Sequence, residues 1–596
     1  MAGLEERAKA LGIAVEYEGT GGQHHRAPDA TLAALTAAFG DGAGPADATL
    51  RAPGGVRCHL PDGLRGWGVA VQLYQLRSDR NWGIGDFADL LALAPHLAAA
   101  GADFVGLNPV HSLFLADPAA CSPFSPSDRR FLNPLYLAVD RMKGFVPTMA
   151  DPAALRAVRG TDLVDYPAVA ALKLRALRAI WMAAGSPDAD PAFCAEDRDD
   201  LDRHALFEAV SAHMAAQGHG AAWTEWPADW QEADGPAIRT FAADHAAELA
   251  FHRWLQQETD RQLAAAHRAC LKAGMRIGLY LDFAVGEARG GAGSWGRTDV
   301  LNGVRIGAPP DYFNESGQDW GLMALSPVAM TEGRAAPFAA LMRRAMTHAG
   351  ALRIDHAMGL WQLFLIPDGT DPSAGTYARY PVGDMLTALA DASHARGAMI
   401  IGEDLGNVPD GFRAVMDEVG ILSYRILLFE RGEAGYIPPA DYPVNAMVCL
   451  STHDLPTFQG WWQGDDIRLR RRFGLVRAAT AEEQTAARKG ERRDLLNALA
   501  AEGLIAPGTT PPAEGPAPEA IVTAVHRFLA RAPSRLMAVR LEDLAGELRP
   551  VNLPSTTDDD HPNWRPKLRR DWREIVRSDR FGALTQAIAA ERPRNK

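Results

Sequence analysis

The stretches ALRIDH (351–356) and AMIIGEDL (398–405) decide the fold, because in each an aliphatic run ends on charged residues. Such a run is typical of a strand whose two faces are both covered by helices, as in a parallel sheet. Six further runs of this kind occur: GVAVQLYQL (68–76), ADFVGLNPV (102–110), MRIGLYLDF (275–283), RILLFE (425–430), AMVCLSTHD (446–454) and LMAVRLEDL (536–544). Most follow an amphipathic helical stretch. Eight such strands in series predict an α/β fold, a (β/α)8 TIM barrel, rather than an open sheet.

The intervals between these runs are uneven and predict large helical insertions in the barrel. The long interval after residue 110 is rich in helix-forming residues, so we expect a helical subdomain at about 111–270. A second insertion is expected at 468–531. Residues 1–65 show two helical stretches and predict a small helical N-terminal module with a packing or scaffold role. The catalytic barrel is then expected over residues 66–596.

Composition excludes several classes of protein. The 596 residues include 61 basic and 74 acidic side chains, a net charge of −13, which disfavours nucleic acid as a partner. No uninterrupted apolar run of ~18 residues is present, so we expect no membrane span. The N-terminus lacks the basic and apolar regions of a signal peptide. Five cysteines without a CxxC pair favour a reducing cytoplasm.

Charged residues gather where the predicted strands end, which in a barrel is the catalytic face. The candidates are Asp282, Arg353, Asp355, His356, Glu403, Asp404, His453, Asp454, Glu542 and Asp543. Carboxylates placed after buried runs are costly unless they are paired or used. Two carboxylates of unequal pKa are what retaining glycoside chemistry requires, and a third can stabilise the oxocarbenium charge.

Structural roles for the same residues stay open at this point. Asp355 and Arg353 lie two apart on one strand and so on one face, where they can form a buried ion pair. Either Glu403 or Asp404 can cap the following helix. His356 and His453 can be hydrogen-bonded core residues, since neither has another histidine near it in the sequence.

A metal site is the weaker interpretation. His356, Glu403, His453 and Asp454 are ligand types that a barrel metallohydrolase uses. However, the sequence contains no HxH or HExxH pair, and each of these histidines stands beside an acid. We therefore expect no metal and no other cofactor.

Seven ordered segments show that the chain resembles a known family. They are VQLYQLRSDRNWGIGDFADL (71–90), CSPFSPSDRRFLNPLYL (121–137), IGAPPDYFNESGQDWGL (306–322), LRIDHAMGLWQLFLIP (352–367), IGEDLGNVP (401–409), STHDLPTFQGWW (451–462) and LPSTTDDDHPNWRPKL (553–568). The chain is similar over these segments to the amylomaltases, bacterial 4-alpha-glucanotransferases related to the alpha-amylase clan. The combination is specific, whereas RIDH or GED alone is weak.

The resemblance implies roles for particular residues. Asp355 would be the nucleophile, Glu403 the acid/base and Asp454 the carboxylate that stabilises the transition state. Other residues would bind the sugar: Arg353, His356, His453, Trp320, Gln318, Phe124, Asn563 and Asp282. Phe124 stands where related sequences often place Tyr, and the glycine-rich stretch after Asp282 also departs from some relatives.

The chemistry of sugars independently favours the loop around Trp320. Sugar sites combine amides or carboxylates with aromatic platforms, and Asp311, Tyr312, Phe313, Gln318 and Trp320 form such a cluster. The alternative is that Trp320 only packs its loop onto the barrel. Trp461 and Trp462 are expected to be structural.

Together these observations predict a retaining 4-alpha-glucanotransferase that acts on alpha-1,4-glucans such as maltooligosaccharides and the dextrins of starch or glycogen. An alpha-glucan hydrolase would use the same carboxylates. A non-catalytic glucan-binding protein would keep the aromatic platforms without the carboxylates.

Overall fold

The computed structural model describes residues 2–19, 22–45, 49–310, 316–433, 435–512, 514–557 and 560–594. Eight parallel strands close into a barrel in which each strand pairs with the next along the chain, and the last pairs with the first. The strands are β3 (Gly66–Val71), β4 (Phe104–Leu107), β7 (Gly278–Phe283), β11 (Ala351–Ile354), β14 (Met399–Gly402), β15 (Leu422–Ile426), β18 (Ala446–Cys449) and β19 (Leu536–Arg540). The predicted TIM barrel is confirmed.

One predicted strand is displaced along the chain. We expected a strand at 425–430, but β15 lies at Leu422–Ile426 and the chain turns after it. Along β15 buried residues alternate with partly exposed ones, among them Ser423 and Arg425. A search for continuous apolar runs therefore misses its first half and extends into the following turn.

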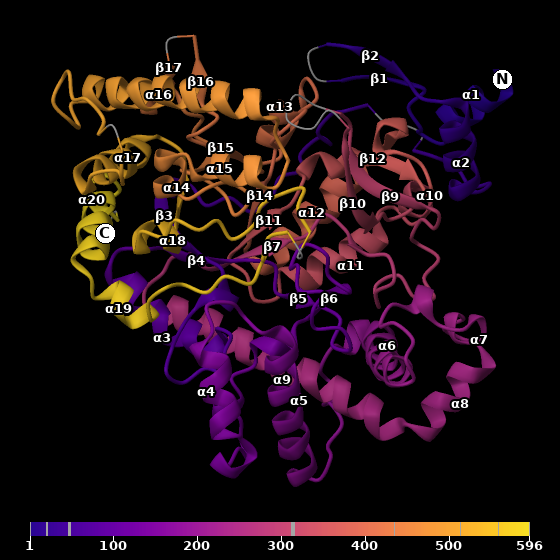
Figure 1. The fold of residues 1–596 in the computed structure, drawn as a ribbon. Coiled ribbons are helices and arrows are strands. Elements are labelled where there is room, and N and C mark those ends of the chain that lie inside the picture. Colours follow the sequence, from indigo (N-terminus) through magenta and orange to yellow (C-terminus); the bar gives the residue numbers. More distant parts are fainter. Residues whose placement is uncertain are drawn as a thin grey trace.

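Helices cover the outside of the barrel between most pairs of strands (Figure 1). The layer consists of α3 (Phe87–Ala99), α9 (Ala246–Lys272), α11 (Ala336–Ala345), α12 (Val382–Arg396), α13 (Phe412–Glu418), α17 (Glu519–Arg531) and α20 (Asp579–Glu591). Asp86 begins α3 with a capping box in which its carboxylate and that of Asp89 accept reciprocal backbone hydrogen bonds. Between β15 and β18 the described residues form a short hairpin, β16 (Arg431–Gly432) and β17 (Gly435–Tyr436), instead of an α-helix.

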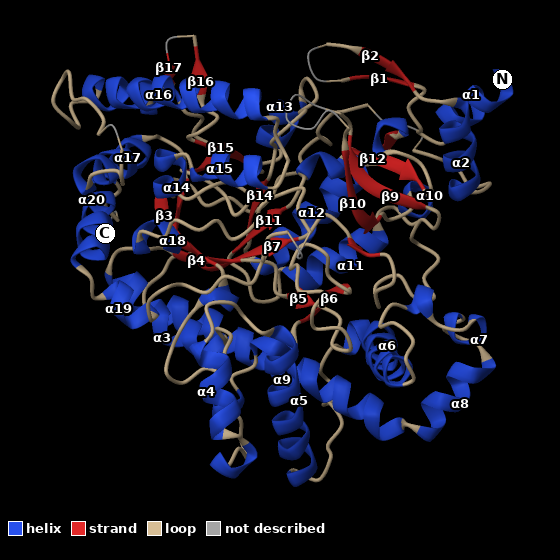
Figure 2. Ribbon diagram, viewed as in Figure 1, coloured by secondary structure: helices blue, strands red, loops and turns tan. Residues whose placement is uncertain are grey.

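Helices also dominate the two insertions, which lie at opposite sides of the barrel (Figure 2). The first contains the hairpin strands β5 (His111–Ser112) and β6 (Asp128–Leu132), followed by α4 (Pro152–Gly160), α5 (Tyr166–Ala183), α6 (Arg198–Ala216), α7 (Ala228–Gln231) and α8 (Pro236–Asp244). The helix α9 closes this stretch and packs against α6 of the insertion as well as α3 and β7 of the barrel, so it joins the two. On the opposite side of the barrel lie α14 (Phe458–Gln463), α15 (Asp465–Arg472) and α16 (Ala478–Ala501).

A second sheet stands beside the barrel and was not predicted. Its five strands run antiparallel in the order β13 (Thr376–Arg379), β12 (Gln362–Pro367), β9 (Val304–Ala308), β10 (Gln318–Met323) and β8 (Glu287–Ala288). These strands come from the connections that follow β7 and β11. The pairs β9–β10 and β12–β13 join consecutive strands, but β12–β9 and β10–β8 join segments that lie far apart in the sequence, so local pattern gives no sign of the whole sheet.

The N-terminal module packs on the free edge of this second sheet. It contains α1 (Ala2–Ala10) and α2 (Asp29–Phe39), as expected, together with a hairpin of β1 (Glu16–Glu18) and β2 (His24–Arg26) that the purely helical prediction lacked. Ile13 forms an antiparallel bridge with Ala378 of β13. The module therefore covers a sheet edge that would otherwise expose unpaired backbone groups.

The remaining helices are short: α10 (Pro327–Glu332), α18 (Leu541–Ala545) and α19 (Trp572–Val576). Within the described part of the chain, no helix combines the length and apolar character needed to cross a membrane.

Candidate active site

Arg353 lies at the centre of a buried cluster of charges at the barrel mouth. It pairs in register with Asp282 of the neighbouring strand, and its Nη1 donates to Asp282 Oδ1 at 2.7 Å. Its Nη2 lies 2.9 Å from Asp355 Oδ1. The expected pair between Arg353 and Asp355 is thus present, but one guanidinium is shared by two carboxylates. Asp282 is 8% exposed, and burial raises its pKa although Arg353 opposes that shift.

The register of β11 and β14 brings Asp355 beside Glu403. Ile354 pairs with Gly402, so the two carboxyl groups follow directly on neighbouring strands. The chain turns sharply after Asp355, where His356 adopts a left-handed conformation with φ of 47°. This strained turn directs the N–H of His356 to Glu403 Oε2 at 2.9 Å. The peptide bond that follows Asp355 therefore fixes the carboxyl group of Glu403.

Glu403 is held in a protonatable state. Only 9% of the residue is exposed, and Oε1 accepts a second backbone hydrogen bond, from Leu405, at 3.1 Å. Burial raises its pKa to about 7; the nearby Asp355 also raises it, whereas Arg353 and the two backbone donors lower it. A carboxyl group with this pKa can donate and accept a proton near neutral pH.

The neighbouring acid, Asp404, has a structural role. Its Oδ1 accepts from the backbone N–H of Tyr424 at 2.8 Å, and its Oδ2 accepts from Ser423 at 2.5 Å and Arg413 at 2.9 Å. Asp404 therefore fastens the end of β14 to the start of β15. Neither acid caps the following helix as expected, because the N-cap of α13 is Gly411 and has no side-chain hydrogen bond; Asp404 holds the ends of two strands instead.

Asp454 differs from the other two carboxylates because it lies on a loop five positions beyond the last residue of β18. His453 Nε2 lies 3.2 Å from Asp454 Oδ2, and the Asn552 amide donates to Oδ1 at 2.6 Å. Loss of water around the carboxyl group favours its neutral form, but His453 and the hydrogen bonds lower its pKa to about 2. Asp454 is therefore an anion at neutral pH, and its side chain is 46% exposed.

Aromatic rings form a wall beside Asp454. Phe124 stacks on the imidazole of His453, with ring centroids 4.4 Å apart and an angle of 26°. Trp564 lies at 5.3 Å from Phe124 and 5.5 Å from His453. The loop that carries Phe124 and the loop that carries His453 thus meet at this stack.

A second aromatic group approaches from the five-stranded sheet. Trp320 on β10 meets the edge of His356, with centroids 5.1 Å apart, and its indole N–H donates to Gln318 Oε1 at 3.2 Å. Gln318 and Trp320 therefore lie together next to the residue that follows Asp355. The other members of the expected cluster, Asp311, Tyr312 and Phe313, lie outside the described residues.

Comparison with known proteins agrees with this arrangement. A family model described as 4-alpha-glucanotransferase, glycoside hydrolase family 77, matches residues 71–571. The chain belongs to this family. It is a 4-alpha-glucanotransferase.

Named relatives and solved structures extend the comparison. The 4-alpha-glucanotransferase of Mycobacterium tuberculosis H37Rv is 39% identical over 89% of this chain and 76% of its own length. The 4-alpha-glucanotransferase of Haemophilus influenzae is 35% identical over 84% of this chain and 75% of its own. The amylomaltase of Corynebacterium glutamicum superposes with a TM-score of 0.83 at 25% identity, covering 98% of this chain and 99% of that one. The fold is also shared with the Streptococcus agalactiae amylomaltase in complex with acarbose, with a TM-score of 0.68, 18% identity and coverage of 89% and 100%.

One expected sugar-binding residue of this 4-alpha-glucanotransferase is engaged within its own loop. Asn563 is 5% exposed, and its Oδ1 accepts from the N–H of Leu553 at 2.9 Å. Its amide nitrogen donates to Thr556 Oγ1 at 2.9 Å. The side chain therefore closes the 553–563 loop, an arrangement that favours support of the site over contact with sugar.

Two groups of the 4-alpha-glucanotransferase site were missed in the sequence. Asn552, which holds Asp454, has no distinguishing local pattern and lies far along the chain. Trp564 directly follows Asn563, and an aromatic residue in the PNW segment was the signal that could have identified it. Its backbone is left-handed, with φ of 59°, and its carbonyl accepts from Tyr166, the first residue of α5. The helical insertion is thereby tied to the aromatic wall.

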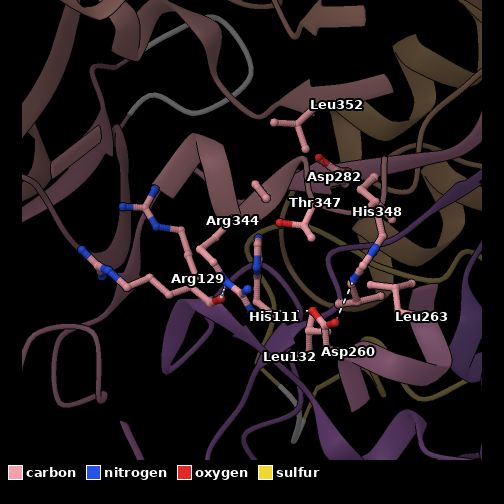
Figure 3. A pocket seen from close by; sticks show the side chains of 14 residues that line it. His111, Arg129, Leu132, Asp260, Leu263, Asp282, Arg344, Thr347, His348 and Leu352 are labelled. Atoms are coloured by element: carbon pink, nitrogen blue, oxygen red, sulfur yellow. Dashed lines mark hydrogen bonds and ion pairs between the residues drawn. The ribbon is translucent and has the colours of Figure 1, made fainter. Parts of the chain in front are cut away.

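A separate cavity of the 4-alpha-glucanotransferase lies between the barrel strands and the helices α9 and α11 (Figure 3). Of the predicted site residues it includes Asp282. His348 faces Asp260 within it at 3.0 Å, and Arg344 lies 3.7 Å from the same carboxylate. Among the described residues, no group of three or more His, Cys, Asp or Glu side chains is arranged to hold a metal ion.

Proposed function

We propose that Asp355, Glu403 and Asp454 carry out a retaining transfer of alpha-1,4-glucan segments. The observation that carries this proposal is the contrast in pKa between Glu403, which lies beside Asp355, and Asp454, on the loop that follows β18. Burial raises the pKa of Glu403 to about 7, whereas His453 and Asn552 lower that of Asp454 to about 2 despite its partial burial. One group can therefore transfer a proton at neutral pH, and the other remains an anion throughout.

In the first step a carboxylate oxygen of Asp355 attacks the anomeric carbon of a glucosyl unit, and the bond to the glycosidic oxygen breaks. The proton of Glu403 passes to that oxygen, which leaves as the 4-OH of the released glucan. Asp454 stabilises the positive charge that develops on the sugar ring. The ion pair with Arg353 orients the carboxylate of Asp355.

In the second step the 4-OH of an acceptor glucan or of glucose attacks the same carbon and displaces Asp355. Glu403, now ionised, takes the hydroxyl proton, so the acid/base returns to its starting state. Inversion at each step gives net retention. Transfer in place of hydrolysis requires that acceptor sugars displace water from the site.

We assign the sugar unit next to Asp355 to a pocket built by polar and aromatic groups. Arg353, Asp282 and His453 line a common cavity at the barrel mouth. Asp355 and His356 line a second cavity, Trp320 meets the edge of His356, and Phe124 stacks on His453. Polar groups can bind the hydroxyls and the rings can cover the C–H face of a glucose unit. Gln318 adds an amide next to Trp320, and Asn563 supports the loop opposite.

We infer that maltooligosaccharides and starch- or glycogen-derived dextrins are the substrates of this site. The Streptococcus agalactiae amylomaltase, which shares the fold, is in complex with acarbose, and this supports a glucan-like ligand. A cytoplasmic location is proposed as well, because Cys58, Cys194, Cys270 and Cys449 are free thiols.

The roles of Asp355 and Glu403 can be separated with two donors. Maltotriose needs a proton on its leaving group, whereas α-maltotriosyl fluoride releases fluoride without acid help. Glu403→Gln should lose transfer from maltotriose and still cleave the fluoride, while Asp355→Asn should lose both. Wild-type enzyme should convert maltotriose into glucose and longer oligomers. Equal loss of both donors in Glu403→Gln, or only shorter products from wild type, would contradict the assignment.

A further inference from the structure

Arg540, at the end of β19, anchors the loop that carries Asp454. Its Nη1 donates to Ser451 Oγ at 2.9 Å, to the carbonyl of Thr452 at 2.7 Å and, more weakly, to that of Leu455 at 3.2 Å. These acceptors flank His453 and Asp454 on both sides. Only 6% of Arg540 is exposed, so its charge would be costly to bury without such partners.

The rest of the same loop is fastened to the segment that follows Arg540. Asp543 Oδ1 accepts from the N–H of Phe458 at 2.7 Å, and the hydroxyl of Thr457 donates to the carbonyl of Glu547 at 2.7 Å. Glu542 lies 3.5 Å from Arg540 Nη2 and is 2% exposed. The two acids after β19, which the sequence offered as catalytic candidates, are thus used to hold the neighbouring loop and the guanidinium.

Arg540 also borders the sugar pocket directly. It lines the same cavity as Arg353, Asp282 and His453, and Glu542 lines it beside Arg540. A displacement of Arg540 would therefore move the backbone of Ser451 to Leu455 relative to Asp355. Since β18 ends at Cys449, no strand pairing holds this backbone in the way that β11 and β14 hold the other two carboxylates.

We propose that Arg540 is a positioning residue for the transfer reaction, which sets the place of Asp454 by holding three acceptors of its loop, while Glu542 neutralises the buried guanidinium. This inference rests on the role of Asp454 given under Proposed function. Nη1 meets the three loop acceptors while Nη2 faces Glu542, so the planar guanidinium contacts the loop and the acid together, which the single ammonium of lysine does not reproduce. The consequence is a site whose third carboxylate is in place before substrate binds.

The test uses four variants of the full-length enzyme. Arg540→Met removes the guanidinium, and Arg540→Met with Glu542→Gln also restores the charge balance. Arg540→Lys keeps the charge alone. Arg592→Met is the matched control: Arg592 is 2% exposed and donates to the carbonyls of Gly66, Ala530, Ala532 and Ser534 near the opposite end of β19.

Turnover of maltotriose and Tm are measured for each variant. A misplacement of about 1 Å in a reacting group costs on the order of 100-fold, so kcat of the double variant should fall about 100-fold with KM nearly unchanged. Its Tm should recover relative to Arg540→Met. Arg540→Lys should fall in between, and Arg592→Met should lose stability without this loss of kcat. Recovery of kcat together with Tm would overturn the proposal.

Binding gives a second readout that a purely structural role would not move. In an Asp355→Asn background, where turnover is blocked, Kd is measured by calorimetry for maltotetraose and for acarbose, whose first ring is flattened like the transition state. The Arg540 variants should weaken acarbose at least tenfold more than maltotetraose. Equal weakening of the two ligands would contradict the proposal. If Asp355→Asn alone remains active, the assignment of Asp355 as nucleophile is wrong. The proposal for Arg540 is then still tested by comparing the loss of kcat in the Arg540 variants with the loss in Arg592→Met.

Discussion

The three carboxylates of the site are held in two different ways. Asp355 and Glu403 follow directly on paired strands, and one backbone N–H, that of His356, joins them. Asp454 lies beyond the end of β18 and depends on side chains from distant segments, including Asn552 and the partners of its loop. The strands therefore fix the distance between Asp355 and Glu403, whereas the position of Asp454 depends on loop contacts. Substitutions of Asp355 or Glu403 should abolish steps of the reaction. Substitutions around Asp454 should lower kcat by smaller factors.

The largest effect is expected at the strand-held nucleophile. Asp355→Asn removes the attacking oxygen but keeps the size of the side chain, so kcat for maltotriose should fall by roughly 10⁴-fold or more. Product formation is followed by chromatography of the oligomers. Asp384→Asn, on the barrel helix α12, serves as a control and should retain wild-type turnover. A loss of less than tenfold in Asp355→Asn would show that the register of β11 does not place the nucleophile.

A smaller effect is expected where the loop-held carboxylate loses one partner. Asn552→Ala removes the 2.6 Å donor to Asp454 Oδ1. A charge-assisted hydrogen bond contributes about 1.5–3 kcal/mol, so kcat should drop roughly 10- to 100-fold, with the same pH limb as wild type. Steady-state kinetics on maltotriose measures the change. Unaltered kcat would mean that the loop positions Asp454 without this amide.

The pH profile separates Glu403 from Asp454. Glu403 must carry a proton to cleave the donor, so kcat/KM should decline as pH rises through about 7, by roughly tenfold per pH unit above it. Asp454, with its pKa lowered to about 2, should add no limb between pH 4 and 7. Asp404→Asn is the neighbouring control and should lower Tm while leaving the limb in place. If the fall of kcat/KM shifts to another pH in Asp404→Asn, or if kcat/KM does not fall up to pH 9, the assignment of Glu403 is contradicted.

The smallest effect is expected at the aromatic wall. Phe124→Leu removes a ring that stacks 4.4 Å from His453. Aromatic pairs contribute about 0.5–1.5 kcal/mol, so KM for maltotriose should rise about two- to tenfold, and kcat should change less. Phe124→Tyr, which keeps the ring, is the matched control. If Phe124→Leu lowers kcat far more than it raises KM, the ring supports His453 and Asp454 instead of the sugar.

The sequence predicted the strand-held half of the site better than the loop-held half. Aliphatic runs that end on Asp355 and Glu403 are local patterns, and a barrel brings the ends of its strands together without further information. The burial of Trp461 and Trp462, at 4% and 0% exposure, likewise agreed with expectation. Strand β15 was displaced because its polar residues alternate with buried ones, which hides it from a search for apolar runs.

The loop-held half depends on contacts between distant segments. Asn552 reaches Asp454 across 98 positions, and Arg540 reaches Thr452 across 88. Arg540 lies in a run that predicted a buried strand, and Asn552 directly precedes the 553–568 segment, but neither pattern identifies the distant loop that the side chain contacts. Asn563 belongs to a motif that resembles a sugar-binding segment, but its hydrogen bonds to Leu553 and Thr556 within the loop had no sign in the sequence. The five-stranded sheet that presents Trp320 was missed partly for the same reason, because its β12–β9 and β10–β8 pairs join segments that lie far apart in the sequence.

The central claim, that Asp355 attacks the sugar while Glu403 handles the proton, is tested most directly by trapping the covalent intermediate. Glu403→Gln enzyme is mixed with α-maltotriosyl fluoride and digested with pepsin at low pH, and the peptides are identified by tandem mass spectrometry. A maltotriosyl adduct on Asp355, absent in the Asp355→Asn, Glu403→Gln double variant, is the expected result. An adduct on Asp454 or Asp282, or fluoride release at the wild-type rate without any adduct, would contradict the account.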